Sequence, residues 1–422
     1  MWRWIVRLAA LVLIAIAAYG LFAVLWGVSS VVDRPLSRDP ATVAAGRYLA
    51  AAGDCASCHT AKGGEAFAGG RPLATPFGTI YSANITPDPK TGIADLNSAQ
   101  FYQLMAYGAD SPLDPLYPAM PYTSFHDITR EDSDALFAYF MSVPAVEQPA
   151  TPNEISFPFN IRPLMFGWNV LFASRRPFEE NPAKDEVWNR GAYLVEGLGH
   201  CGECHTPRNV LGAMEADRIL DGSIVGVFEA PDITATALAD RGWNREDLAL
   251  FFEAGASPQG TAFGDMFLAV KNSLRLLTHD DRLAIATYLM DVDGNAPSKG
   301  AAVVSAQGGN AHENPSGQAL YLSNCSLCHG PDGQGVESTM PRLVGNATLA
   351  QPDGVNLIQV IAHGIDPQRM SLTQGYGPMP AFRDRLSAAQ MADLANYVRS
   401  VFAVNGNDLS DLSEDDVIRI LR

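Results

Sequence analysis

The sequence predicts an all-α chain in which three similar helical domains follow one N-terminal membrane helix. Three observations predict this architecture. A Cys-x-x-Cys-His motif occurs three times, each time after a similar apolar lead-in. Each copy is followed by a segment with an N-terminal capping signature and helical spacing of its apolar residues. The chain also begins with an uncharged run long enough to cross a bilayer.

Residues 1–33 are predicted to be a membrane anchor or a signal sequence. Arg3 and Arg7 precede an uncharged run of 25 residues from Leu8 to Val32. As a helix this run is roughly 37 Å long, enough to cross a hydrocarbon layer of ~30 Å. A cleaved signal peptide normally has a shorter apolar stretch, about 7–15 residues, so we favour an uncleaved anchor. The arginines then place the N-terminus in the cytoplasm and the rest of the chain on the periplasmic side of the inner membrane.

Three domains, at residues 34–145, 185–295 and 313–403, share one frame. In each, a glycine and a tyrosine precede the Cys-x-x-Cys-His motif, and a capped helix closes the domain with a tyrosine ten residues after its cap. The lead-in pairs are Gly46 and Tyr48, Gly191 and Tyr193, and Gly317 and Tyr321; the caps and closing tyrosines are Thr129 and Tyr139, Thr278 and Tyr288, and Ser387 and Tyr397.

Three other segments connect or extend these domains. Residues 146–184 are rich in proline and aromatic residues, which predicts an extended strap packed on the surface. Residues 296–312 are rich in small and polar residues and predict a flexible linker. Residues 404–422 form an acidic tail with one short helix expected after Ser413.

The composition bounds the possible functions. With 47% hydrophobic and 18% charged residues, the 422-residue chain can bury several cores. Its formal net charge of -17 argues against nucleic acid as a partner, because that role needs clustered Lys and Arg.

All six cysteines belong to the repeated motifs, so none is left for a structural disulfide. In such a motif the thiols add to the vinyl groups of haem and the histidine becomes an axial ligand of the iron. A zinc ribbon would need a second Cys or His pair for each metal, and a thioredoxin-like motif expects βαβ surroundings. We therefore predict three class I cytochrome c domains with three covalent haems c. The attachment sites are Cys55, Cys58, Cys201, Cys204, Cys325 and Cys328, and the axial histidines are His59, His205 and His329.

The second motif overlaps a match to the GxGxxG dinucleotide fingerprint, between Gly197 and Gly202. That fingerprint requires a preceding strand, whereas a helical lead-in is predicted here, so we regard the match as coincidence.

Each domain also offers a methionine, expected in a loop before the closing helix, as the sixth iron ligand. Met120 and Met266 each lie 61 residues after their motif histidine, and Met379 lies 50 residues after His329. A thioether ligand raises the reduction potential relative to a second nitrogen donor. Core packing is the alternative role for methionine. Met340 and Met370 are rival ligands in the third domain.

Several longer strings make the chain resemble the triple-haem cytochrome c subunits of bacterial membrane-bound dehydrogenases. The strings are Gly69-Gly-Arg-Pro-Leu-Ala-Thr-Pro-Phe-Gly-Thr79, Asn84-Ile-Thr-Pro-Asp-Pro89, Leu116-Tyr-Pro-Ala-Met-Pro-Tyr-Thr-Ser124, Phe159-Asn-Ile-Arg-Pro-Leu164, Asn189-Arg-Gly-Ala-Tyr-Leu-Val-Glu-Gly-Leu-Gly-His200 and Cys204-His-Thr-Pro-Arg-Asn209. The resemblance covers nearly the whole exported chain.

The resemblance implies an electron-transfer subunit of a complex. In that family a separate subunit with a flavin, quinone or molybdenum cofactor oxidises an alcohol, polyol, sugar acid, aldehyde or N-heterocycle. The cytochrome passes the electrons to ubiquinone or another respiratory acceptor. We assign no catalytic residue, because no flavin, molybdenum or pyrroloquinoline site is visible in the sequence. The alternatives are an electron donor for a terminal oxidase and a haem peroxidase-like enzyme, which would need an open iron site.

Overall fold

The computed structural model describes most of the chain, in two compact units. The described residues are 2–29, with the backbone alone from 22 to 29, and 31–109, 115–173, 177–291, 314–337, 339–366, 376–404 and 409–422. Unit 1 comprises Met1–Glu180 and Glu196–His200, and unit 2 comprises Asn181–Val195 and Cys201–Arg422. The predicted linker 296–312 and Met370 lie outside the described residues.

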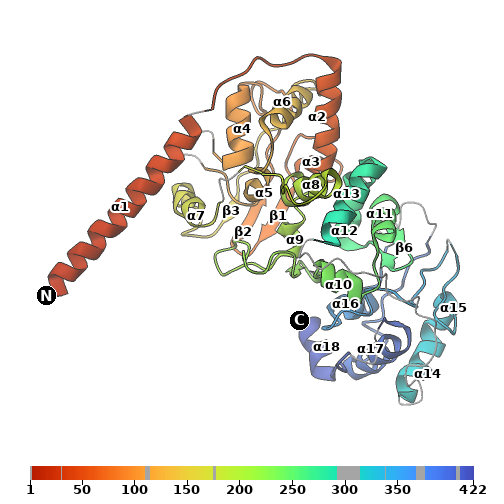
Figure 1. The fold of residues 1–422 in the computed structure, drawn as a ribbon. Coiled ribbons are helices and arrows are strands. Elements are labelled where there is room, and N and C mark those ends of the chain that lie inside the picture. The colour runs from red at the N-terminus through yellow and green to blue at the C-terminus, as the bar shows by residue number, and fades with distance from the viewer. Residues whose placement is uncertain are drawn as a thin grey trace. The chain divides into compact units, whose positions relative to one another are not determined.

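Unit 1 begins with the apolar helix α1 and continues into small helices around one sheet (Figure 1). By length and composition α1 can cross a membrane, a test that a signal sequence also passes. Strands β1, β2 and β3 form an antiparallel sheet in that order. The elements are α1 (Trp2–Ser29), α2 (Pro40–Ala52), α3 (Cys55–His59), β1 (Pro72–Thr75), β2 (Gly78–Tyr81), α4 (Ser98–Tyr107), α5 (Tyr122–Phe125), α6 (Arg130–Phe140), β3 (Glu154–Ile155), η1 (Arg162–Leu164) and α7 (Met165–Phe172).

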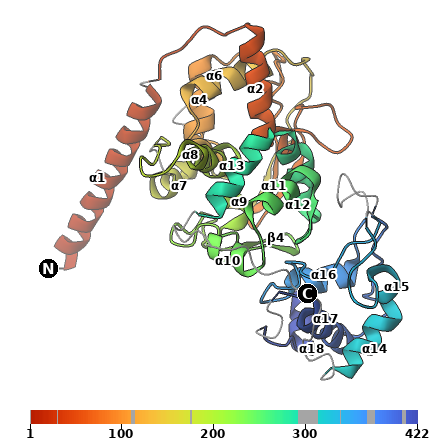
Figure 2. The same cartoon turned by 45° about the vertical axis from the view of Figure 1, so that its right-hand side comes forward.

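Unit 2 carries the second and third motifs, and Figure 2 shows its helices from a second direction. Its elements are α8 (Glu186–Ala192), α9 (Gly202–His205), β4 (Ser223–Val225), β5 (Phe228–Ala230), α10 (Ala235–Asp240), α11 (Arg245–Ala254), β6 (Ala256–Ser257), β7 (Gly260–Thr261), α12 (Gly264–Asn272), η3 (Leu274–Leu276), α13 (His279–Leu289), α14 (Pro315–Asn324), α15 (Ser326–His329), α16 (Val355–His363), α17 (Ala388–Phe402) and α18 (Glu414–Ile420). The π-helical segment η2 (Tyr193–Leu198) leads into the second motif, where the dinucleotide fingerprint would require a strand.

The fold differs from an all-α chain by three small antiparallel sheets, because β4 pairs with β5 and β6 pairs with β7 in addition to the sheet of unit 1. The segment 146–184 is also less extended than expected, since it contains η1 and the apolar helix α7 in addition to the strand β3. The short helix expected after Ser413 is present as α18.

The predicted caps begin all three closing helices. The side chains of Thr129, Thr278 and Ser387 accept hydrogen bonds from the backbone N–H three residues later, at 3.1, 3.1 and 3.2 Å. Each cap satisfies one of the free N–H groups at a helix N-terminus. The closing helices α6, α13 and α17 therefore begin where the sequence places them.

Each lead-in helix crosses its closing helix at a glycine. A Cβ atom on Gly46 would lie 1.9 Å from the carbonyl oxygen of Ala135 and 2.8 Å from the Cβ of Tyr139. The same contacts recur at the other two crossings: Gly191 meets Ala284 and Tyr288, and Gly317 meets Asp393 and Tyr397. The lead-in glycine and the closing tyrosine of the sequence repeat are thus in contact with each other. Only glycine lets the two backbones approach this closely.

The first prediction concerns this crossing. We expect Gly46→Ala to destabilise unit 1 by roughly 1–3 kcal/mol, because a backbone carbonyl cannot move aside for the added methyl group. Gly167→Ala is the matched control, since Gly167 lies in helix α7 and a Cβ there would meet nothing within 4 Å. Thermal unfolding followed by circular dichroism would measure both. Equal melting temperatures for the two variants would contradict the crossing contact.

Candidate functional site

The cysteines of the three motifs lie in or directly before the short helical turns α3, α9 and α15. None of the six forms a disulfide. Burial raises the pKa of Cys55 and of Cys201 to about 12, and that of Cys325 to about 11. At neutral pH these three groups are therefore thiols and not thiolates.

Each motif histidine donates a hydrogen bond from its Nδ1 to a backbone carbonyl. The acceptors are Ala83 for His59 at 2.7 Å, Pro231 for His205 at 2.7 Å and Pro341 for His329 at 2.9 Å. Because a carbonyl oxygen can only accept, Nδ1 carries the proton in all three rings. The lone pair of the neutral imidazole is then on Nε2, where it can bind a metal.

The electrostatic setting keeps these rings neutral. Burial lowers the pKa of His59, His205 and His329, and the hydrogen bond to the carbonyl opposes that shift only in part. Each ring therefore holds its metal-binding lone pair free of a proton at neutral pH.

A glycine completes the fixation of each histidine. The backbone N–H groups of Gly69, Gly222 and Gly335 donate to the carbonyl oxygens of His59, His205 and His329, at 2.8, 2.7 and 2.8 Å. All three glycines have positive φ angles, of 76°, 87° and 66°, which residues other than glycine rarely adopt. We call this pair of bonds, one from Nδ1 and one to the backbone carbonyl of the same histidine, the histidine clamp.

The segment that accepts from Nδ1 is also repeated in the first two domains. Directly after Ala83, the side chain of Asn84 accepts from the backbone N–H and hydroxyl of Thr86, at 2.9 and 2.7 Å. Directly after Pro231, the side chain of Asp232 accepts from the backbone N–H and the hydroxyl of Thr234, at 2.8 and 2.7 Å. Sequence reasoning missed these carbonyls. The shared Asn/Asp-Ile-Thr string could have revealed them.

The third motif opens onto an apolar cavity of about 150 Å³. One water molecule needs only ~10–15 Å³ by this measure, so the cavity suits a much larger group. Cys325, Cys328 and His329 line it together with Met379 and the rival Met340. Both predicted methionines of this domain that the structure describes therefore face the same space.

Two features fix the walls of this cavity. The backbone of Met379 pairs with Ile365 through hydrogen bonds of 2.9 and 3.1 Å. Thr261 and Phe263, from the segment before Met266, line the cavity as well. Residues that follow the second motif thus contribute to the cavity beside the third motif.

The other two predicted ligands differ in setting. Met120 ends a turn in which its N–H donates to the carbonyl of Tyr117 at 3.1 Å. Met266 was expected in a loop, but it lies in the first turn of helix α12, where it packs against Phe267 and Val270. Sequence reasoning also missed Met214: its sulfur would lie 3.4 Å from a Cβ placed on Gly202, inside the second motif.

The donor set fits haem better than a bare metal ion. In the described part of the chain, no three His, Cys, Asp or Glu side chains gather closely enough to hold a metal ion. Two cysteines, a neutral imidazole with its lone pair free, and an apolar cavity lined by a thioether are instead what a covalently attached haem requires.

Comparison with known proteins agrees with this chemistry. A family model described as cytochrome c oxidase, cbb3-type, subunit III matches residues 312–398. A nicotinate dehydrogenase subunit of Pseudomonas putida is 42% identical over 85% of this chain, although the match spans only 30% of that protein's length.

Other relatives match over most of their own length. The cytochrome c subunit of alcohol dehydrogenase (quinone) of Komagataeibacter europaeus is 37% identical, over 86% of this chain and 81% of that subunit. The gluconate 2-dehydrogenase cytochrome c subunit of Pantoea cypripedii is 36% identical, over 90% of this chain and 91% of that subunit. With identity at this level along nearly the whole length, the chain belongs to the family of cytochrome c subunits of bacterial dehydrogenases.

Proposed function

We propose that this chain carries three haems c in three tandem class I cytochrome c domains and conducts electrons from a partner dehydrogenase to a quinone or another respiratory acceptor. The proposed domains are residues 34–145, 185–295 and 313–403. The observation that carries the proposal is the histidine clamp, which recurs at His59, His205 and His329 with the same donor atom and the same type of acceptor.

The proposed ligand set pairs each clamped histidine with a methionine: His59 with Met120, His205 with Met266, and His329 with Met379. A haem iron held between these groups takes up and releases one electron. The clamp keeps Nε2 deprotonated and holds the ring in one orientation, and the two thiols of each motif attach the macrocycle covalently. The mainly apolar lining around Met379 disfavours water at this site. Two protein ligands on each iron leave no open position, which suits electron transfer and not catalysis.

We further propose a membrane setting and a partner. Helix α1 would remain uncleaved and place the domains on the periplasmic side. The named relatives belong to alcohol, gluconate, fructose and nicotinate dehydrogenases. We therefore propose a separate subunit with a flavin, quinone or molybdenum cofactor that oxidises an alcohol, a sugar or sugar acid, an aldehyde or an N-heterocycle.

One observation bears on the alternative of an oxidase donor. The family model named for an oxidase subunit matches residues 312–398, which is the third proposed domain alone. The dehydrogenase subunits match 85–96% of this chain. The longer match favours a dehydrogenase partner.

The second prediction tests the number of haems. Pyridine haemochrome analysis of the purified protein should give three haems c per chain, and the reduced protein should not bind carbon monoxide. The double variant Cys201→Ser/Cys204→Ser should give two haems and lose one haem mass from the intact chain. A wild-type ratio of two, or ready binding of carbon monoxide to the wild-type protein, would contradict the proposal.

The third prediction separates the two methionines that line the third cavity. Met379→Ala should open one iron in three, so that the reduced variant binds about one equivalent of carbon monoxide per chain and one component of the redox titration moves to lower potential. Met340→Ala is the matched control and should behave as wild type in both measurements. The reverse result would assign the ligand to Met340.

The fourth prediction concerns the partner. The tagged chain, purified from membranes in mild detergent, should retain a second subunit, and one class of substrate should then reduce its haem absorption bands. Ethanol, gluconate, fructose and nicotinate form the test panel. After the second subunit is stripped away, none of these compounds should reduce the haems. Reduction of the isolated chain by a substrate would instead indicate catalysis in this chain.

A further inference from the structure

The exposed apolar side chains of unit 1 are concentrated in one segment. Beyond α1, the large apolar side chains that are exposed in the described part of unit 1 are Val32 and five residues between Phe157 and Leu171. Phe157 is 78% exposed and Leu171 is 70% exposed. We name these five residues the strap patch: Phe157, Ile161, Leu164, Val170 and Leu171. A group of exposed apolar residues of this kind marks an interaction surface.

Helix α7 carries two of the five patch residues and has no charged side chain. Its sequence is Met165-Phe-Gly-Trp-Asn-Val-Leu-Phe172. Met165, Trp168 and Asn169 are buried against unit 1, and Val170 and Leu171 lie on the other side, exposed. A helix that is apolar on all faces is expected in a protein core or in lipid, and not at a water-exposed surface.

The patch lies beside the apolar helix α1. A Cβ atom on Gly20 of α1 would lie 3.1 Å from both Cγ atoms of Val170. In Figures 1 and 2 the short helix α7 stands alongside α1 in both views. Gly20 follows Arg7 by thirteen residues, roughly 20 Å along the helix. If the hydrocarbon begins near Arg7 and is ~30 Å thick, Gly20 and its neighbour Val170 lie within the outer leaflet.

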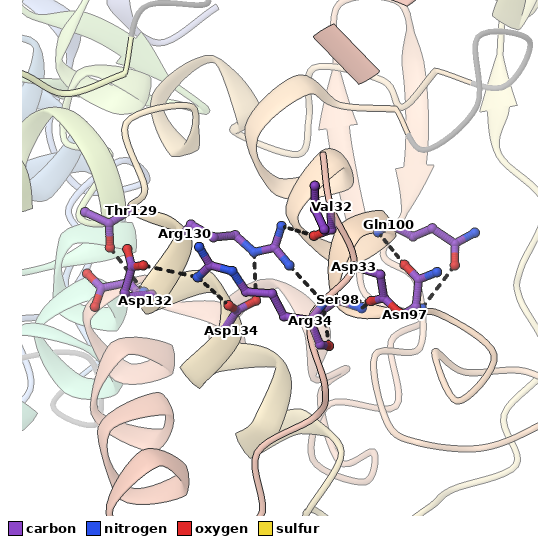
Figure 3. A network of polar contacts seen from close by, with 11 residues as sticks. Val32, Asp33, Arg34, Asn97, Ser98, Gln100, Thr129, Arg130, Asp132 and Asp134 are labelled. Atoms are coloured by element: carbon purple, nitrogen blue, oxygen red, sulfur yellow. Dashed lines mark hydrogen bonds and ion pairs between the residues drawn. The ribbon is translucent and has the colours of Figure 1, made fainter. Parts of the chain in front are cut away.

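The chain that leaves α1 is fixed to the first domain, as Figure 3 shows. Arg130 donates to the carbonyl of Val32 at 3.0 Å, and the N–H of Arg34 donates to the hydroxyl of Ser98 at 2.7 Å. The guanidinium of Arg34 also pairs with Asp134 at 3.1 Å. A domain held at Val32 and Arg34 cannot move far from the end of α1.

We propose that the strap patch inserts into the periplasmic leaflet of the membrane beside α1, with phospholipid acyl chains as its partner. The inference rests on the proposed role of α1 as a membrane-spanning anchor. Lipid accounts for the apolar composition of α7, the exposure of the patch and its contact with α1 at the depth of Gly20.

The same segment supports the loop of Met120. The hydroxyl of Tyr122 donates to Oδ1 of Asn169 in α7 at 2.6 Å. The hydroxyl of Tyr117 donates to the carbonyl of Phe159 at 3.2 Å, and Nε of Arg162 donates to the carbonyl of Pro115 at 2.7 Å. The inserted segment therefore brings the Met120 loop to the membrane surface, where a lipid-soluble electron acceptor is found.

Spin labelling of the full-length chain tests the inference. Single cysteines replace Leu171 in the patch, Ile14 in α1 and Val210 in unit 2, an apolar side chain that is 93% exposed. Each variant is labelled and reconstituted in vesicles of phosphatidylethanolamine and phosphatidylglycerol. Collisions with oxygen report lipid, and collisions with a water-soluble nickel complex report water. A sample without either reagent gives the relaxation due to the haems, and the chain without an added cysteine gives the labelling background.

We expect the labels at Leu171 and Ile14 to collide several-fold more with oxygen than with the nickel complex, and the label at Val210 to show the reverse. If Leu171 behaves like Val210 while Ile14 reports lipid, the patch is not inserted, and the anchor stands. If Ile14 also reports water, the anchor itself fails. Leu171 lies on the surface, so its replacement leaves the fold intact, which circular dichroism and an unchanged haem content would verify.

Discussion

The hydrogen bond from Nδ1 of each motif histidine to a backbone carbonyl constrains everything around it. The bond requires a chain segment that passes the motif with its carbonyl turned inward, at Ala83, Pro231 or Pro341. That segment must pack closely against the loop after the motif. Positive-φ glycines at Gly69, Gly222 and Gly335 allow this, because an added Cβ would lie 2.5–2.7 Å from the passing backbone. The orientation of the imidazole, its tautomer and the path of the loop are therefore set together by one arrangement of hydrogen bonds, which occurs at all three motifs.

The helix crossings place the motifs, and the clamps orient them. Each lead-in helix ends close to its Cys-x-x-Cys-His turn, so the glycine contact with the closing helix fixes where that turn begins. In unit 2 the segment that follows the second motif also contacts the segment that follows the third. Asn356 of α16 exchanges two hydrogen bonds with the backbone of Glu229, at 2.9 and 2.8 Å. Burial, together with the neighbouring Asp353, raises the pKa of Glu229 to about 8. Thr261 and Phe263, which follow the second motif in the chain, line the cavity beside the third motif.

Local and periodic features of the molecule could be predicted from the sequence. The caps at Thr129, Thr278 and Ser387 were located correctly because capping depends on residues three positions apart. The contact of Gly46 with Tyr139 was visible as a repeat, although not as a contact. The acceptor carbonyls of Ala83 and Pro231 were missed because the Asn/Asp-Ile-Thr string that follows both was not recognised as a repeat. The helix at Met266 and the helix α7 were missed because Gly and Pro nearby suggested loops. The small sheets were missed because their strands have only two to four residues.

The central proposal is that the histidine clamp forms the same kind of iron site at all three motifs. Magnetic circular dichroism of the oxidised protein measures this most directly, because the charge-transfer band of a ferric haem reports its two axial ligands. The account predicts a near-infrared band of the histidine–methionine type with an intensity of three haems per chain. A component with two nitrogen ligands, or a high-spin haem with an open position, would contradict the proposed ligand set. The spectra of the methionine variants would then identify the domain in which the ligand is wrong.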